Sequence, residues 1–203
     1  MFAVGHLALG YLTGKATAKS LNVDLNVSLA FFASVLPDVD LLIPGLTHRG
    51  PMHSFVVYVL IFLPFFILYG RRSLVYFVCV SQHIVLGDFL TAGNIGYIQL
   101  LWPLTSDWYG TGFIVTGLDN IALEWLLFSA SFYLILKTKD VKLLLQRHLS
   151  NWMLTVPIVT IVLPVFFNIP LHAPLALFIP HMIFLALFSL SIIVDLKSAL
   201  QNI

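Results

Sequence analysis

The chain has 203 residues, of which 60% are hydrophobic and only 9% are charged. A soluble domain is about 25% charged because its surface faces water, so this composition excludes an ordinary soluble protein. Ten Lys and Arg residues nearly balance nine Asp and Glu residues, which argues against a nucleic-acid partner. The single cysteine, Cys79, excludes a disulfide or a thiolate metal site within one chain, so a metal would be bound by His and carboxylate.

Seven apolar segments are candidates for membrane-spanning helices, because a hydrocarbon core about 30 Å thick requires about 20 helical residues. In chain order they are 2–19, 25–46, 53–70, 73–91, 112–136, 152–171 and 174–195. Residues 92–111 are rich in glycine and aromatic residues and are expected to form a loop at the membrane interface. The N-terminal residues lack the pattern of a removable signal peptide, so we expect the spans themselves to direct insertion. We predict an all-α fold, a polytopic integral membrane helical bundle of about seven helices, with one domain over residues 1–203.

The placement of basic residues predicts the orientation in the membrane. With the N-terminus outside, the helices end inside at Lys15 and Lys19, at Arg71 and Arg72, at Lys137 to Arg147, and at Lys197. This threading puts all four basic clusters on the cytoplasmic side. It also puts the polar residues of five separate segments together at the outer end. We therefore predict a multi-pass cell-membrane protein whose functional site lies at the non-cytoplasmic face.

Two aspartates interrupt the second apolar segment, in the sequence Leu36-Pro37-Asp38-Val39-Asp40. An ionisable residue within a span costs about 2.5–3.5 kcal/mol, so it is retained for pairing, for metal binding or in a wet cavity. Pro37 disfavours helix at Leu36 and is expected to disturb the span. On a continuous helix the two aspartates would point about 200° apart. We favour metal binding for Asp38, whereas Asp40 is equally consistent with a helix cap.

The polar turn His48-Arg49-Gly50-Pro51-Met52-His53-Ser54 precedes the cleanest apolar span. Pro51 suits the first turn of a helix, so His53 is expected near a helix N-terminus. The planar guanidinium of Arg49 suits a phosphate or a carboxylate. The alternative is that Arg49 extends to a lipid headgroup. Its position between two histidines favours a functional role.

His83 and Asp88 lie near the end of the fourth apolar segment, five residues apart. On an α-helix this spacing places them about 140° apart, but a π-bulge at Gly87 would bring them together. The alternative is that His83 bonds a neighbouring helix and Asp88 lies at the interface. Asp119 and Glu124, deeper in segment 112–136, could support the metal ligands, act as a general base or pair with other helices, and the sequence leaves these roles open.

Taken in order, these motifs resemble the inner-membrane metal-dependent hydrolase family, often labelled YdjM-like. The resemblance rests on Gly5-His6, Leu-Pro-Asp38-Val-Asp40, His48-Arg49-Gly-x-x-His53-Ser54, His83 with Asp88, and Leu-Trp102-Pro103. It implies a polytopic membrane protein with a divalent metal site, and it implies hydrolysis only weakly. The family commonly spaces the His and Asp of the fourth motif by four residues, whereas this chain has five. A more remote similarity, in residue types and order, is to zinc-dependent phospholipase C and related single-strand nucleases, which suggests phosphoester chemistry.

The leading hypothesis is a membrane-bound metal-dependent hydrolase that acts on a phosphoester of a lipid or lipid-linked substrate. Imidazole and carboxylate groups bind Zn²⁺, Mn²⁺ and Fe²⁺, and zinc is the favoured divalent metal. Asp40 or Asp88 would take the proton of a metal-activated water, and Arg49 would stabilise the developing charge. The expected partners are membrane lipid and an amphiphilic or phosphorylated small-molecule substrate. The predicted metal ligands are His6, Asp38, Asp40, His48, His53, His83 and Asp88.

Two other functions would use the same residues. A metal-ion or proton transporter needs polar groups along a continuous path, and only Asp119 and Glu124 could extend such a path inward. A membrane scaffold would use the polar cluster only to hold its helices together. Ion flux that is lost in Glu124→Ala would favour the transporter, and tolerance of Arg49→Ala would favour the scaffold.

Overall fold

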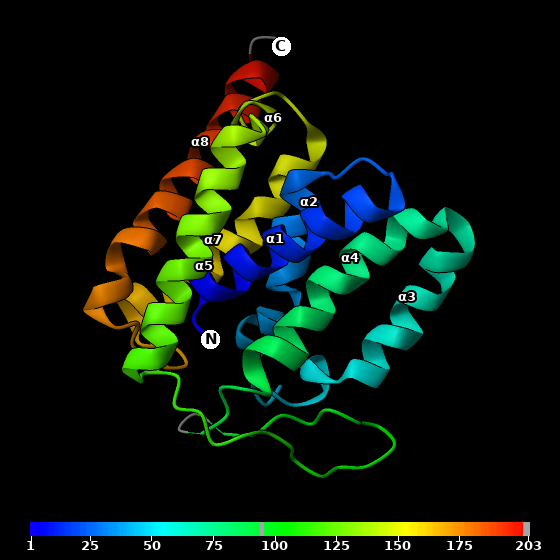
Figure 1. Ribbon diagram of the computed structural model, residues 1–203, viewed down its shortest axis with the longest axis vertical. Coiled ribbons are helices and arrows are strands. Elements are labelled where there is room, and N and C mark those ends of the chain that lie inside the picture. The colour runs from blue at the N-terminus through cyan, green and yellow to red at the C-terminus, as the bar shows by residue number, and fades with distance from the viewer. Residues whose placement is uncertain (94–95, 201–203) are drawn as a thin grey trace.

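The computed structural model describes residues 1–93 and 96–200, and this part of the chain is built from helices (Figure 1). Short 3-10 and π segments, labelled η, interrupt or precede several of the α-helices. The α-helices are α1 (Ala3–Leu21), α2 (Val27–Ser34), α3 (Phe55–Tyr69), α4 (Arg71–Gln82), α5 (Leu118–Lys137), α6 (Asp140–Leu144), α7 (Thr155–Val162) and α8 (Phe178–Leu200). The predicted all-α class is confirmed.

Three described stretches are long and apolar enough to cross a membrane, namely Leu118–Lys137, Leu149–Phe167 and Leu175–Lys197. They correspond to the predicted segments 112–136, 152–171 and 174–195. The shorter apolar helix α3 corresponds to segment 53–70, and its Ile67 and Leu68 side chains are 74% and 73% exposed. Apolar side chains exposed to this extent over a contiguous surface require lipid around them.

The predicted segment 2–19 is confirmed as a helix, but α1 is enclosed by the bundle. Val4, Leu7 and Tyr11 are fully buried, and α1 packs against α4 on one side and α5 on the other. Glycines permit this close approach, since a β-carbon at Gly14 would lie 2.7 Å from Cys79 Sγ of α4. The helix that carries the predicted ligand His6 in its first turn is therefore held inside the bundle.

Segment 25–46 is interrupted at Pro37, as the sequence predicts. α2 ends at Ser34, and the chain continues as the 3-10 helix η1 (Leu36–Leu42). Pro37 explains the change, because its ring lacks an N–H and disfavours α-helix at the preceding residue. In segment 73–91, α4 passes directly into the π-helix η3 (His83–Asp88). Ahead of α3, the 3-10 helix η2 (Pro51–His53) leads to Ser54, whose hydroxyl caps α3.

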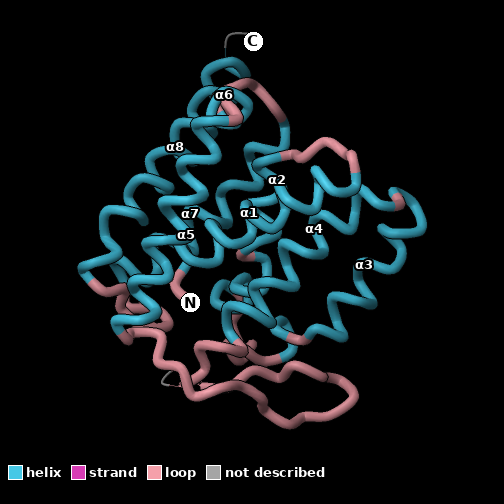
Figure 2. Tube along the Cα trace, in the orientation of Figure 1, coloured by secondary structure: helices cyan, strands magenta, loops and turns pink. Residues whose placement is uncertain are grey.

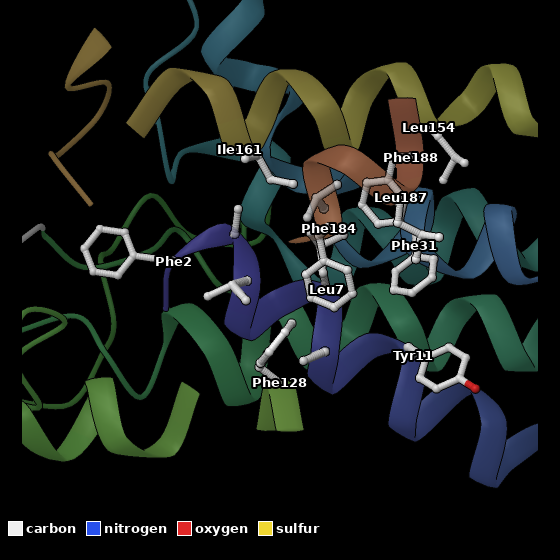
Figure 3. Packing of buried hydrophobic residues seen from close by; sticks show 14 of the residues in the cluster. Phe2, Leu7, Tyr11, Phe31, Phe128, Leu154, Ile161, Phe184, Leu187 and Phe188 are labelled. Atoms are coloured by element: carbon white, nitrogen blue, oxygen red, sulfur yellow. The ribbon is translucent and has the colours of Figure 1, made fainter. Parts of the chain in front are cut away.

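A cluster of aromatic side chains joins α2 to α5 and α8. Phe31 of α2 packs against both Phe184 and Phe188 of α8, with ring centroids 5.6 and 4.9 Å away, and Phe128 of α5 meets Phe184 edge-on (Figure 3). Leu7 of α1 belongs to the same core cluster. This packing fixes α1 and α2 relative to the lipid-facing helices.

The connection 96–117 lies at one end of the molecule and α6 at the other (Figure 2). Between Gly96 and Thr111 the chain forms turns and one isolated bridge, Ile98 with Tyr109, without a helix. The predicted loop 92–111 is thus confirmed where it is described, and its residues 94–95 lie outside the described residues.

Candidate metal centre

Four candidate ligands come together on three short segments that are not α-helical. Asp38 lies on η1, His53 ends η2, and His83 and Asp88 are the first and last residues of η3. One ligand atom from each lies within 4.8 Å of the other three. His53 and His83 are fully buried, Asp88 is 2% exposed and Asp38 is 9% exposed.

The π-helix explains the five-residue spacing of the fourth motif. One π turn brings residues i and i+5 together, so His83 and Asp88 face the same side, with His83 Nε2 3.3 Å from Asp88 Oδ2. Gly87 is required at this turn because a β-carbon there would lie 2.3 Å from His6 Cε1. Of the two alternatives raised by the sequence, the π conformation at Gly87 is confirmed.

The spacing of the four ligand atoms fits a divalent ion. Asp88 Oδ2 lies 2.9 Å from His53 Nε2, while Asp38 Oδ1 lies 3.6 Å from His53 Nε2 and 3.5 Å from His83 Nε2. A tetrahedral ion with bonds of about 2.0–2.1 Å requires ligand atoms about 3.4 Å apart. His53 Nε2, His83 Nε2 and Asp88 Oδ2 are buried without a hydrogen-bond partner, which is uncommon for polar atoms in a protein interior. A bound cation would satisfy all three.

The neighbours of the two histidines leave the Nε2 atoms available as ligands. His83 Nδ1 lies 2.7 Å from the carbonyl oxygen of Ser34, so the ring donates from Nδ1 and presents the lone pair of Nε2. His53 Nδ1 lies 3.2 Å from Asp40 Oδ2. Carboxylate or carbonyl partners of this kind fix the ring orientation of metal-binding histidines.

Asp40 lies behind the four ligands and contacts three groups of the polar turn. Its Oδ1 accepts from His48 Nδ1 at 2.9 Å, and its Oδ2 accepts from the Arg49 backbone amide at 3.0 Å. Its Oδ2 also lies 3.2 Å from His53 Nδ1, so Asp40 is placed to orient His53.

Asp40, His48 and His53 also form a second group that could hold an ion. A neutral imidazole has one lone pair, so His53 cannot serve both groups at once. The first group fits a metal better, because its atoms lack hydrogen bonds whereas both Asp40 oxygens already accept one. The structure brings all the predicted ligands of η1, η2 and η3 into one region.

His6 lies against this region but outside the group of four. Its ring stacks on His83 with centroids 3.7 Å apart, and its Nε2 lies 3.4 Å from Asp88 Oδ1. His6 thus packs on one ligand and contacts another.

Arg49 points into the protein, so the alternative that it extends to a lipid headgroup is wrong. The side chain is 1% exposed, and its Nη2 donates to Asp88 Oδ1 at 2.7 Å. Its Nη1 donates to the carbonyl oxygen of Gly96 at 2.6 Å, and its backbone has a positive φ of 65°. A non-glycine residue in this region is strained, and such strain is concentrated at functional sites.

The sequence left the role of Glu124 open, and the structure shows which groups its carboxylate contacts. Its carboxylate accepts from the backbone amides of Phe2 at 2.9 Å and Gly5 at 3.2 Å, and from the Asn120 side chain at 2.7 Å. Glu124 therefore caps the first turn of α1 from a neighbouring helix, where a negative charge also complements the helix dipole. No residue spacing in the sequence signals this contact, because it joins α1 to α5.

Two of the four candidate ligands, Asp38 and Asp88, line a cavity of about 40 Å³. Its polar wall contains Asp38, His48, Arg49 and Asp88, and the rest is mainly apolar, including Phe2, Leu41 and Leu171. The volume is sufficient for a water molecule beside the ligands, since one water needs about 10–15 Å³.

The fold and this site define an all-helical membrane protein with a buried His/Asp group that could hold a metal ion. The chain matches the YdjM inner membrane protein family over residues 1–175, and it belongs to that family. The match continues well past the last motif of the resemblance, Trp102-Pro103. No curated protein and no solved structure matches the chain.

Proposed function

We propose that this protein is a membrane-bound metal-dependent hydrolase. The observation that carries the proposal is the arrangement of Asp38, His53, His83 and Asp88 around one point beside a cavity. Two imidazoles and two carboxylates suit zinc, with Mn²⁺ or Fe²⁺ as alternatives. A metal bound there would lower the pKa of a water molecule and polarise the bond to be cleaved.

Residues around the cavity are assigned three further roles, namely proton transfer, anion binding and orientation of a ligand. Asp38 is the most exposed of the four ligands and lies in the cavity wall, so its second oxygen is suited to accept a proton from a reacting water. Arg49 lies in the same wall, and although its Nη atoms already donate to Asp88 and to Gly96, its Nε has no partner, so we propose that its charge attracts an anionic group such as a phosphoester. Asp40 has both oxygens occupied, which favours an orienting role over the role of general base.

The substrate class follows from the walls of the cavity. The apolar lining beside Arg49 and two carboxylates suits an amphiphilic molecule with a phosphorylated head, and the cavity, which at about 40 Å³ holds only water, would have to widen to admit it. We propose a phospholipid or a lipid-linked phosphate as substrate, reached from the non-cytoplasmic side.

Packing of the interior next to the candidate metal centre argues against the alternative function of a metal-ion or proton transporter. The interior next to the centre contains the fully buried Leu7, Phe31 and Val35, and the polar side chains beside them, Ser34 and Gln82, donate to helix carbonyl oxygens. A transport path requires polar groups through this layer. Glu124, the residue proposed to extend such a path, is engaged in capping α1.

Metal analysis and hydrolysis measured on the same preparations test the proposal. Purified protein is expected to contain one divalent ion per chain, and His83→Ala or Asp38→Ala is expected to lose it. Release of the product from a fluorescent phospholipid and from a chromogenic phosphodiester should fall with the metal content. Wild-type protein that takes up no divalent ion after dialysis against zinc, manganese or iron would remove the mechanism.

A further inference from the structure

A second cavity, of about 440 Å³, lies among the start of α2, the start of α4 and the chain that follows α6. This volume is within the range of small-molecule sites in proteins. Arg72 from α4 and Arg147 from the segment after α6 both line it. Arg72 and His83 are 11 residues apart along continuous helix, so the cavity is roughly 16 Å from the metal centre.

The charge of this cavity is positive. Neither Arg72 nor Arg147 has a carboxylate partner or a hydrogen bond within residues 1–93 and 96–200. Asp24 is the one acidic side chain in the lining, so two arginines minus one aspartate leave a formal charge of +1. By contrast, Arg49 is paired with Asp88. Two unpaired guanidinium groups that converge from distant parts of the chain form a site for a bidentate anion.

The wall behind the arginines is polar and held in place by its own hydrogen bonds. Ser28 donates to Asn151 at 2.6 Å, and Asn26 and Ser150 bond each other at 3.0 and 3.1 Å. Asn26 also caps α2, so the N-terminus of this eight-residue helix faces the cavity, and helix N-termini favour anions. The Tyr76 hydroxyl oxygen accepts from the backbone amide of Asn26, so the hydroxyl proton of Tyr76 is left for a ligand.

The remaining walls and the position favour a lipid. Leu25, Val27 and Leu143 provide an apolar side to the cavity. Leu143 of α6 and the chain that follows it line the cavity, and α6 lies at the end of the molecule where α5 ends (Figure 1). Basic pockets between membrane helices at this level are suited to anionic headgroups.

We propose that this cavity binds the phosphate-bearing headgroup of an anionic phospholipid, with Arg72 and Arg147 on the phosphate and the acyl chains beside Leu143. His148 and Tyr76 would donate to the remaining headgroup oxygens. This site is separate from the metal centre and does not depend on the proposed hydrolysis.

Native mass spectrometry of the purified full chain tests the proposal. The protein is titrated with phosphatidylglycerol or phosphatidylcholine, and bound lipid is counted at each concentration. The wild type is expected to bind one phosphatidylglycerol in preference to phosphatidylcholine. Each basic contact at a membrane surface contributes about fivefold in affinity, so Arg72→Ala with Arg147→Ala is expected to lower it about 30-fold.

A matched control removes two positive charges near the second cavity but outside its lining. Arg71→Ala with Lys142→Ala changes two basic residues outside the lining and should retain wild-type binding. Equal phosphatidylglycerol affinity in both double variants would overturn the proposal. Saturable binding of inorganic phosphate without binding of the lipid would overturn the assignment to a headgroup.

The metal-centre variant Asp38→Ala separates this proposal from the proposed function. It should lose metal yet bind phosphatidylglycerol like the wild type. Loss of lipid binding in Asp38→Ala, in protein whose unfolding temperature is unchanged, would contradict a separate site.

Discussion

Replacing Gly87 with alanine tests whether the π-turn assembles the metal centre. A β-carbon at residue 87 would lie 2.3 Å from His6 Cε1 and 2.6 Å from His6 Nδ1. Carbon atoms pack at about 3.5–4.0 Å, so the imidazole or η3 must move by roughly 1 Å. The stack of His6 on His83, at 3.7 Å, passes that movement to a metal ligand.

The expected magnitudes follow from this displacement. Overpacking of a filled interior costs about 1–3 kcal/mol, which should lower the unfolding temperature. A reacting group misplaced by about 1 Å costs about 100-fold in rate, so hydrolysis should fall more than stability does. We would measure thermal unfolding in detergent, zinc retention against a chelator, and phospholipid hydrolysis. Gly112→Ala is the matched control, because a β-carbon there has no atom within 4 Å.

A double variant distinguishes a steric conflict between residue 87 and His6 from the loss of backbone freedom that any replacement of Gly87 causes. His6→Ala removes the ring that meets the new β-carbon, so Gly87→Ala with His6→Ala should be more stable than the sum of the single effects by about 1 kcal/mol or more. Wild-type zinc retention and hydrolysis in Gly87→Ala would refute the reasoning. If the stability losses of the two single variants simply add in the double variant, the contact between His6 and residue 87 is refuted.

Three further predictions concern residues around the centre. Asp40→Asn should weaken zinc binding about 10–100-fold in a chelator competition, because His53 loses its orienting carboxylate; an unchanged affinity would exclude that role. Glu124→Gln should lower stability by about 1–3 kcal/mol in thermal unfolding while the protein retains its metal, since an amide cannot accept all three N–H groups; loss of metal with full stability would contradict a capping role. A cysteine introduced at Leu104, which is 77% exposed, should react with an impermeant thiol reagent only from the non-cytoplasmic side, and labelling only from the cytoplasm would reverse the proposed orientation.

The membrane fold could be predicted because it depends on composition along the chain. A charge content of 9% cannot cover a water-facing surface, and segments such as 174–195 are long enough to span the bilayer. Hydropathy does not distinguish a helix surrounded by lipid from one surrounded by protein. Segment 2–19 therefore has the pattern of a span, whereas α1 is packed between α4 and α5.

The grouping of the candidate ligands could be predicted from the sequence, but the separate contacts of each residue could not. His53, His83, Asp38 and Asp88 are costly in a membrane, and that cost identifies them without a structure. The separation of Asp40 from the four ligands depends on which oxygens accept hydrogen bonds, and spacing contains no such information. The partner of His83 Nδ1 is a backbone carbonyl, at Ser34, which has no signature in the side-chain pattern.

The irregular helices explain how distant segments supply one metal centre. A regular α-helix presents neighbouring ligands only at i+3 or i+4, whereas here the ligands come from two 3-10 segments and one π segment. Irregular backbone at membrane depth is stable only where protein surrounds it, because lipid cannot satisfy its amides and carbonyls. η3 packs on α1 and α4, η1 packs on α2 and α7, and η2 packs on α3, so these helices supply that surrounding surface. A substitution that restored α-helical geometry to η3 would therefore leave helix in place but separate His83 from Asp88, and metal binding should be lost before the fold is.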